Sequence, residues 1–424
     1  MKGPIYIGLI GFGTVGSGVV KVLQDNADLI EKRVGQPIKI KKIADKDLAR
    51  PRIVSVEPGL LTTDVNQVLN DPEVSIIVEA IGGIEPAKKI ILEAIGKGKH
   101  VVTPNKEVIA KHGEEIFKAA EKMQVSVLFE GSVGGGIPII RPLRICLAAN
   151  RIKEVHGIVN GTTNYILSKM HIEGRDFEEV LAEAKTKGYT EADPSSDIDG
   201  YDAAYKAAIL AAVAFGAKVK LEDVYFEGIR KINQKDISYA KEMGYLIKLL
   251  AIAKETREGL EVRVHPTLIP QEHPLASVSG AFNAIYVKGD AVGEVMFYGE
   301  GAGALPTGSA VVGDIIEIAK KGFIPPLHFE EKKVRKIGEI SGKYYIRIQA
   351  PDKVGVLAAI SSVFAEKKVS IAAVAQKETV GQVAHIVIIT HITQEKAIQE
   401  ALSKMKGLPE VLEISNVIRV GLES

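Results

Sequence analysis

The sequence predicts an α/β protein in three parts: a doubly wound parallel sheet, an α+β middle part, and a small βαββαβ unit at the C-terminal end. Three observations support this prediction. Residues 1–131 alternate apolar strand-like runs with helical stretches, residues 8–20 read GLIGFGTVGSGVV, and about 80 C-terminal residues repeat short strands and helices. At 424 residues the chain is too long for one ordinary core.

The N-terminal part begins with an apolar run over residues 4–10, the motif Gly11-x-Gly13-x-x-Gly16 and a helical pattern over 19–34. Further strands are expected at 38–44, 75–83, 100–104 and 125–131, with helices over 86–97 and 106–122. Because the glycine motif lies between a strand and a helix, it fits the dinucleotide-binding fingerprint in the context that the fingerprint requires. We therefore expect a Rossmann-type domain.

The choice between NAD and NADP depends on the residues after the second strand. An acidic residue there favours the ribose hydroxyl of NAD, and a basic residue favours the 2′-phosphate of NADP. Asp45 is followed by Lys46, and Arg50 and Arg52 lie just beyond. The sequence leaves the choice open, with a lean toward NADP.

The middle part starts with the glycine-rich loop GSVGGGIP (131–138), which cannot be a helix interior. Helices are expected over 176–187 and 201–215, and a second glycine-rich turn at 299 leads into a helix that reaches 320. This last helix is expected to pack back on the Rossmann-type domain. Residues 321–342 have the charge, proline and glycine content of a linker, and a ferredoxin-like βαββαβ unit follows.

The predicted helix over 201–215 has only two charged residues, Asp202 and Lys206, four apart on one face. An exposed ion pair is the ordinary interpretation. The rest of the helix is apolar on nearly every side, however, as in a buried helix, where two charges need a reason. This pattern favours catalysis or substrate binding.

Other loops offer weaker candidates. Lys106 follows a strand end, where it could meet an anion or simply start a helix in water. Glu130 and the glycine loop after it offer oxygen ligands for a hard cation, or a hinge. Residues 187–200 carry four carboxylates without the EF-hand spacing, which suits a substrate-facing loop or a solvated turn.

The composition excludes several classes of protein. With 54 basic and 53 acidic residues the chain has no electrostatic footprint for nucleic acid or an anionic membrane. The single cysteine, Cys146, rules out an intrachain disulfide; its apolar neighbours predict a core residue rather than a nucleophile. The single cysteine makes the cytoplasm the expected location, and the apolar run over 207–217 is too short to span a bilayer.

Six strings occur in the order seen in homoserine dehydrogenases: GFGTVGSG, TPNK, FEGSVGGGIP, NGTTNYIL, GYTEADPSSDIDGYDAAYK and GEGAGALPTGSAVVGD. The resemblance covers residues 1–320. The string APDKVGVLAAISSVFAEKKVSI resembles an ACT domain, an amino-acid-sensing module. The resemblance implies NAD(P)-dependent interconversion of L-homoserine and L-aspartate 4-semialdehyde in threonine, methionine and isoleucine biosynthesis, with feedback regulation by an amino acid.

The resemblance also implies roles for particular residues. Lys206 would be the acid/base group, Asp202, Glu191 and Gly188 would bind substrate, and Lys106 would lie between cofactor and substrate. The remaining cofactor contacts would be Phe12, Gly13, Thr14, Val15 and Gly303, with Lys46 beside them. Glu130 and the carbonyls of Val133, Gly135 and Ile137 would hold a monovalent cation, Na or K.

The predicted organisation is therefore an NAD(P)-binding domain over 1–131, a catalytic and dimerisation domain over 132–320, a linker over 321–342 and an ACT domain over 343–424. Threonine is the expected effector, near the turn at 352–355, and deletion of 335–424 is expected to leave a folded, threonine-insensitive enzyme. ACT domains commonly pair, so a homodimer or homotetramer is expected.

Two other classes of function stay open. Another Rossmann dehydrogenase of a small amino or hydroxy acid would share the glycine motif, but not the strings around Asp202 and Lys206. Aspartate-semialdehyde dehydrogenase would need a nucleophilic cysteine. A non-catalytic amino-acid sensor would need neither Asp202 nor Lys206.

Overall fold

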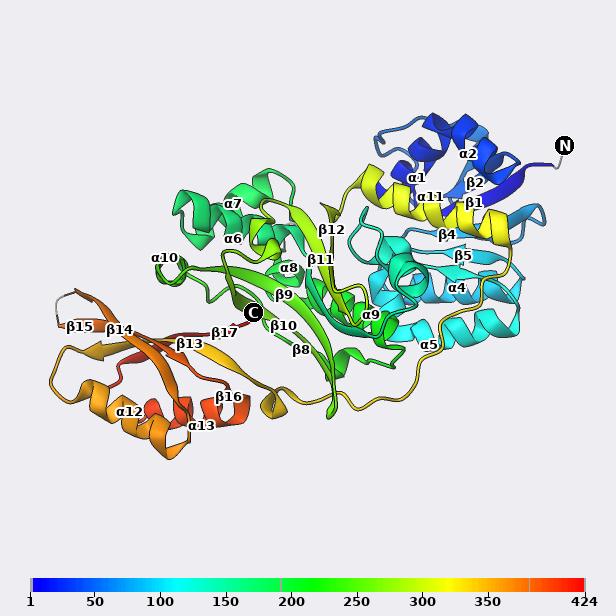
Figure 1. Ribbon diagram of the computed structural model, residues 1–424. Coiled ribbons are helices and arrows are strands. Elements are labelled where there is room, and N and C mark those ends of the chain that lie inside the picture. The colour runs from blue at the N-terminus through cyan, green and yellow to red at the C-terminus, as the bar shows by residue number, and fades with distance from the viewer. Residues whose placement is uncertain (1–2, 191–192, 381, 423–424) are drawn as a thin grey trace. The chain divides into compact units, whose positions relative to one another are not determined.

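The protein is described by a computed structural model that covers residues 3–190, 193–380 and 382–422 (Figure 1). The chain forms two compact units. The first unit comprises Met1–Val159, Tyr205–Leu221 and Phe282–Lys332, and the second comprises Asn160–Ala204, Glu222–Ala281 and Lys333–Ser424. The middle part of the chain therefore contributes to both units.

The first unit contains a six-stranded parallel sheet in the order β3-β2-β1-β4-β5-β6. Its strands are β1 Ile5–Ile10, β2 Ile38–Ala44, β3 Leu61–Thr62, β4 Val74–Glu79, β5 His100–Val102 and β6 Val127–Leu128. Its helices include α1 Thr14–Asp25, α2 Ala27–Val34, α3 Asn66–Leu69, α4 Glu85–Gly96 and α5 Lys106–Lys122. This strand order is that of dinucleotide-binding sheets, so the Rossmann-type prediction is confirmed.

The single helical pattern expected over 19–34 is instead two helices, α1 and α2, separated at Asn26. Both the backbone N–H and the side-chain amide of Asn26 donate to the Val22 carbonyl, at 3.2 and 3.3 Å. Asparagine competes with helical hydrogen bonds in this way, which is why it favours helix ends.

Helix α11, Ala304–Lys321, packs against α1 in the same unit, as the yellow and blue helices of Figure 1 show. Their closest approach uses two glycines. A Cβ atom on Gly18 would lie 1.8 Å from the Ala304 carbonyl oxygen, and one on Gly308 would lie 2.6 Å from the Gly18 backbone. Larger residues at these positions would force the two helices apart.

Three antiparallel strands complete the first unit: β7 Ile152–Ile158, β11 Phe282–Gly289 and β12 Glu294–Glu300, in the order β12-β11-β7. Cys146 ends a π-helical turn, Pro142–Cys146, and is exposed. The prediction that Cys146 is a core residue is therefore wrong. The turn directs Pro142 and Leu143 inward, and it leaves Cys146 and Ile145 on the surface.

The second unit contains the hairpin of β9, Tyr245–Thr256, and β10, Gly259–Pro270, with β8, Tyr225–Phe226, alongside β10. Its helices include α6 Gly161–Glu173, α7 Phe177–Thr186, α8 Ser195–Ile198 and α10 Gln234–Glu242. Helix α9, Tyr201–Phe215, begins in this unit and continues into the first.

The C-terminal strands are β13 Ser341–Pro351, β14 Ile371–Val380, β15 Val383–Thr390, β16 Thr393–Gln394 and β17 Glu413–Val420, and the helices are α12 Val356–Glu366 and α13 Glu395–Met405. The order β17-β13-β15-β14 confirms the ferredoxin-like prediction. Strand β17 also pairs with β10, at Thr267–Arg419 and Leu268–Val420. The hairpin and the C-terminal sheet are thus continuous.

A buried ion pair joins the same two regions. The carboxylate of Asp236 on α10 accepts from Arg347 Nε of β13 at 2.7 Å, and both side chains are almost fully buried. Tyr345 and Asn416 donate to the same carboxylate. Deletion of residues 335–424 would remove all three donors and would expose Asp236 and the edge of β10 that pairs with β17, which is destabilising. Point variants of the whole chain are therefore the better test of regulation.

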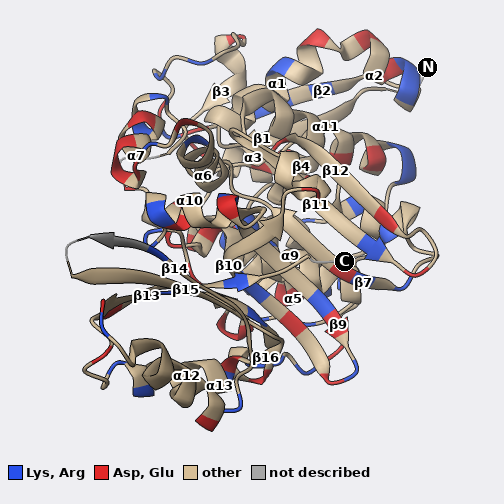
Figure 2. Cartoon of the chain, turned by 60° about the vertical axis from the view of Figure 1, so that its left-hand side comes forward, with Lys and Arg blue, Asp and Glu red and all other residues tan. Residues whose placement is uncertain are grey.

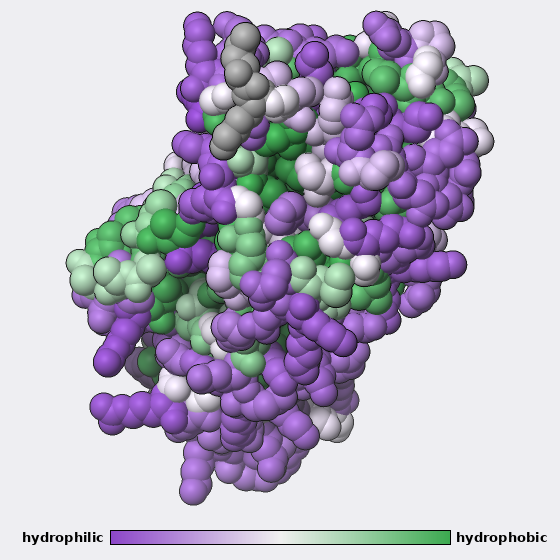
Figure 3. Space-filling view, turned by 90° about the vertical axis from the view of Figure 1, so that its right-hand side faces the viewer, coloured by the Kyte–Doolittle hydropathy of each residue, from purple (hydrophilic) through white to green (hydrophobic). Residues whose placement is uncertain are grey.

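Basic and acidic side chains are interspersed over the chain, as the balanced composition predicts (Figure 2). Hydrophilic residues cover most of the face in Figure 3, and hydrophobic residues gather there in separate patches. Within the described ranges, no helix is both long enough and apolar enough to cross a membrane.

Candidate functional site

The glycine motif forms a tight turn between β1 and α1. Gly11 has a φ of +98°, and a Cβ atom there would lie 2.5 Å from the Ala80 backbone; at Gly16 it would lie 2.0 Å from the Gly11 oxygen. At Gly13, by contrast, a Cβ atom would meet nothing within 4 Å. The open backbone of Phe12–Val15 thus leads into the start of α1, where N–H groups favour an anion such as a pyrophosphate.

Gly303 lies at the start of α11, next to the residue that contacts α1 in the first unit. It precedes the first residue of α11 and has a φ of +122°, a conformation that favours glycine. The next residue, Ala304, is the one that meets Gly18 of α1. The second glycine turn is therefore adjacent to the helix that follows the first.

At the end of β2, the two oxygens of the Asp45 carboxylate accept from the Phe12 N–H at 2.5 Å and from the Asp47 N–H at 2.8 Å. The guanidinium of Arg52 lies over the Phe12 ring, 4.6 Å from its centroid, and Nε donates to the Phe12 carbonyl at 2.8 Å. The other Arg52 nitrogens donate to the carbonyls of Asp47, Leu48 and Arg50. Lys46 is exposed.

A polar network occupies the carboxyl ends of β4 and β5. The Thr103 hydroxyl donates to the Glu79 carboxylate at 2.6 Å, and the Asn105 amide donates to the Gly83 carbonyl at 2.8 Å. Asn105 also caps α5, whose first residue is Lys106. Burial raises the pKa of Glu79 above its ordinary value. Sequence reasoning missed Glu79, although it is a lone carboxylate at the end of an apolar strand.

Lys206 lies on the part of α9 that belongs to the first unit. It is 9% exposed, and its Nζ donates to the Val159 carbonyl at 2.7 Å. Helix α5 runs beside this part of α9, because Lys111 Nζ lies 5.6 Å from the centroid of the Tyr205 ring. Lys106 and Lys206 therefore come from neighbouring helices.

The first turn of α9 carries Asp202, which is buried in the second unit. The Asn160 amide donates to Asp202 at 2.9 Å and to Asp197 at 2.7 Å. Thr162 donates to Asp197 and to the carbonyl of Tyr189. Sequence reasoning missed the roles of Asn160 and Thr162, although both belong to the quoted string NGTTNYIL.

Two predicted substrate contacts belong to the loop after α7. Gly188 is exposed, with a φ of +72°, and directly precedes Tyr189, whose carbonyl joins the network of Thr162. Glu191 lies outside the described residues.

In the glycine loop, the Glu130 carboxylate accepts from three backbone N–H groups, those of Ile139, Ile140 and Arg141, at 2.5 to 2.8 Å. The Glu130 N–H donates to Asp314 on α11 at 2.8 Å, and burial with the nearby Glu130 charge raises the pKa of Asp314 to about 8. Among the described residues, no group of three or more His, Cys, Asp or Glu side chains could hold a metal ion.

Carbonyl oxygens are the other possible ligands in this loop. Gly135, with a φ of +54°, packs against the backbone of Gly301, and Gly301 in turn packs against the Asn283 side chain. Asn283 is fully buried, and within the described part of the chain neither of its amide atoms has a hydrogen-bond partner. The loop thus lies beside an unsatisfied buried amide.

Comparison with known proteins follows the same division of the chain. The homoserine dehydrogenase model matches residues 138–316, the NAD-binding domain of homoserine dehydrogenase matches 11–130, and the ACT domain matches 344–410. Homoserine dehydrogenase of Synechocystis sp. is 47% identical over 98% of this chain and 99% of its own length. The Bacillus subtilis enzyme is 44% identical over 98% of both chains.

Solved structures agree with these relatives. A homoserine dehydrogenase from Thiobacillus denitrificans has a TM-score of 0.94 and 44% identity, and the match covers 99% of each chain. A hyperthermophilic archaeal homoserine dehydrogenase in complex with NADPH has a TM-score of 0.65 and 28% identity, over 77% of this chain and all of that one. The chain belongs to the homoserine dehydrogenase family of NAD(P)-dependent oxidoreductases and carries a C-terminal ACT domain.

Proposed function

We propose that Lys206 accepts the hydroxyl proton of L-homoserine, returns it in the reverse reaction, and works beside Asp202, which binds the substrate ammonium. The observation that supports this assignment is a buried lysine four residues after a buried carboxylate on one apolar helix. The hydrogen bond from Lys206 Nζ to the Val159 carbonyl orients the amine, and a deprotonated amine can accept the substrate proton.

The bound nicotinamide supplies the hydride chemistry, and the chain supplies proton transfer and orientation. Oxidation of homoserine removes a hydride from the hydroxyl-bearing carbon and a proton from its oxygen, and Lys206 takes that proton. Asn160 holds the Asp202 carboxylate, which fixes the position of the substrate ammonium. We extend the proposal to Lys106, at the start of α5, and to Gly188 and Glu191 as further substrate contacts.

Replacing Asp202 with asparagine is expected to raise the KM for L-homoserine about thirtyfold and to lower kcat much less. The reason is the loss of a charged partner for the substrate ammonium, worth about 2 kcal/mol. A spectrophotometric assay of reduced nicotinamide measures both constants. The matched control is Asp193→Asn, since this exposed carboxylate in the loop before α8 accepts a hydrogen bond from the Ser195 N–H. A fall in kcat with unchanged KM would contradict the assignment.

We propose NAD as the preferred cofactor, against the lean of the sequence toward NADP. The Asp45 carboxylate lies where a 2′-phosphate would meet a negative charge, and it is held by the Phe12 N–H of the glycine turn. The Arg52 donors bond to backbone carbonyls and its guanidinium pairs with Asp45 at 3.6 Å, which leaves Lys46 and Arg50, both exposed, as the other basic groups after β2. The archaeal homoserine dehydrogenase that is 28% identical was solved in complex with NADPH.

Replacing Asp45 with serine is expected to shift the ratio of the dissociation constants of NAD+ and NADP+ toward NADP+ by roughly tenfold, about 1.4 kcal/mol, because one repulsive charge is removed. Isothermal titration calorimetry measures both constants without turnover. The control is Asp47→Ser, whose carboxylate caps the N–H groups of Ala49 and Arg50. Tighter binding of NADP+ than of NAD+ by the unaltered enzyme would refute the preference.

We further propose that a monovalent cation, Na or K, binds the carbonyls of Val133, Gly135 and Ile137. The unsatisfied Asn283 amide beside the loop supports a polar occupant. Hard cations take oxygen ligands of this kind. The Glu130 carboxylate, with its three N–H donors, orders the loop rather than supplying a free ligand.

We propose regulation by an amino acid at the ACT domain, with threonine as the effector, and assembly as a homodimer or homotetramer. Support for assembly comes from β12, the edge strand of its antiparallel group, where Met296 and Tyr298 are exposed beside Phe282 of β11. Exposed hydrophobic groups on an edge strand suit contact with a second copy.

A further inference from the structure

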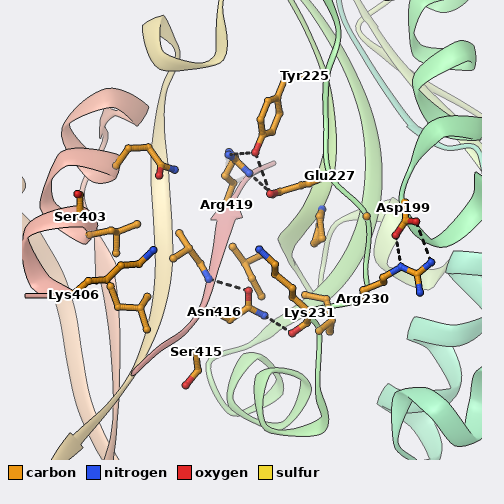
Figure 4. A pocket seen from close by; sticks show the side chains of 18 residues that line it. Asp199, Tyr225, Glu227, Arg230, Lys231, Ser403, Lys406, Ser415, Asn416 and Arg419 are labelled. Atoms are coloured by element: carbon orange, nitrogen blue, oxygen red, sulfur yellow. Dashed lines mark hydrogen bonds and ion pairs between the residues drawn. The ribbon is translucent and has the colours of Figure 1, made fainter. Parts of the chain in front are cut away.

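A polar cavity of about 580 Å³ lies within the second unit, between the ACT domain and the segment around β8. One wall consists of α13 and β17, and the other of residues 225–232 (Figure 4). The cavity is bordered by elements distant in sequence and is partly open to solvent, and it is large enough to take an amino acid with ordered water.

The lining offers charges of both signs. The ammonium groups of Lys231 and Lys406 reach into the cavity from its two walls in Figure 4, and both side chains are exposed. The carboxylates of Asp199 and Glu227 are also present, ion-paired with Arg230 and Arg419. A zwitterion is the class of small molecule that uses both kinds of group, with its carboxylate on the lysines and its ammonium on the acids.

The wall formed by residues 225–232 makes a backbone hydrogen bond to Ile198, in the segment that leads to the proposed substrate-binding residue Asp202. The Ile229 N–H donates to the Ile198 carbonyl at 2.8 Å. A Cβ atom on Gly228 would lie 1.8 Å from that same carbonyl oxygen, so the two backbones are in tight contact. Ile198 lies between Asp197, which Asn160 holds, and the first turn of α9. A shift of this wall must therefore move the backbone that leads to Asp202.

We propose that this cavity binds the amino-acid effector as a zwitterion and transmits its binding to Asp202 through the contact of residues 228–229 with Ile198. The proposal rests on amino-acid regulation at the ACT domain, and it places the effector away from the turn at 352–355. That turn is open to solvent, since Val354 is fully exposed. The cavity, in contrast, has walls from two segments distant in sequence and a connection to the substrate loop.

The test uses the full-length enzyme and the double variant Lys231→Gln/Lys406→Gln. Each of the twenty protein amino acids is added in turn, and binding is followed by calorimetry alongside initial rates with L-homoserine. We expect L-threonine to bind the unaltered enzyme and inhibit it. The double variant is expected to bind threonine at least about tenfold more weakly, because it lacks two charged hydrogen-bond donors, with basal kcat and KM unchanged.

Two control variants separate the possible locations. Lys396→Gln removes an exposed lysine of α13 that does not line the cavity, and it should leave threonine binding unaltered. Asp352→Asn alters the turn at 352–355 and should also leave it unaltered. Unchanged binding in the double variant, or loss of binding only in Asp352→Asn, would overturn the cavity as the effector site. Regulation by an amino acid at the ACT domain would then still hold. If no amino acid binds or inhibits the unaltered enzyme, both the cavity and the proposed regulation fail.

Discussion

Replacing Lys206 with methionine is expected to lower kcat for homoserine oxidation by roughly 10²- to 10⁴-fold, the usual contribution of a positioned acid/base group. Methionine keeps much of the length and apolar character of the side chain on this buried part of α9 and removes only the amine. The limb of the pH profile where kcat/KM rises as a base loses its proton should also disappear. Steady-state rates across pH measure both effects.

Cofactor binding separates this chemical role from a structural one. The Lys206→Met variant should bind NAD+ with an unaltered dissociation constant and unfold at the same temperature as the parent. Lys220→Met, at an exposed lysine beyond the end of α9, is the matched control and should retain full activity. A Lys206→Met enzyme with kcat within tenfold of the parent would exclude Lys206 as the acid/base group, and an inactive parent enzyme would favour a non-catalytic sensor.

Replacing Asp236 with alanine is expected to lower the free energy of unfolding by about 3–5 kcal/mol, because it leaves the Arg347 guanidinium buried without its charged partner. Tyr345 and Asn416 lose an acceptor at the same time. Burial is the dominant influence on Arg347 and lowers its pKa, but the hydrogen bond and charge of Asp236 together keep that pKa above its ordinary value. Urea denaturation followed by circular dichroism measures the loss.

A second variant shows whether the loss comes from the unpaired charge. In Asp236→Leu/Arg347→Met both charges are replaced by apolar groups, and much of the lost stability should return. The control is Glu366→Ala, which breaks the surface pair with Lys404 and should leave the denaturation midpoint unchanged. Equal losses in the free energy of unfolding for Asp236→Ala and Glu366→Ala would show that the buried pair contributes no more to stability than a surface pair.

Much of the fold was predictable because its signals are local. The expected strand over 38–44 and the helices over 106–122 and 201–215 have the same bounds as β2, α5 and α9. Period-two and period-3.6 patterns depend only on neighbouring residues. The glycine motif was informative because Gly11 and Gly16 leave no room for a Cβ atom, as the 2.0 Å approach at Gly16 shows. Asp202 and Lys206 stood out for the same reason, as two charges on one short apolar helix.

The candidate site was less predictable because its hydrogen bonds join residues far apart in the chain. Asn160 holds Asp202 from 42 residues away, and Arg52 reaches Phe12 from 40 residues away. No local pattern distinguishes these side chains from ordinary surface ones. Arg52 was one of the basic residues behind the lean toward NADP, but in the fold its nitrogens donate to backbone carbonyls and its guanidinium pairs with Asp45.

By itself the sequence determined the class of each segment, the family and the two charged residues of α9, because these depend on residue type and short-range spacing. The tertiary structure alone decided the exposure of Cys146, the pairing of β17 with β10 and the buried Asp236–Arg347 pair. Burial and long-range pairing depend on which surfaces meet when the chain folds. The free-energy cost of burying a charged side chain depends on the groups that pack around it in the folded protein far more than on its neighbours in sequence.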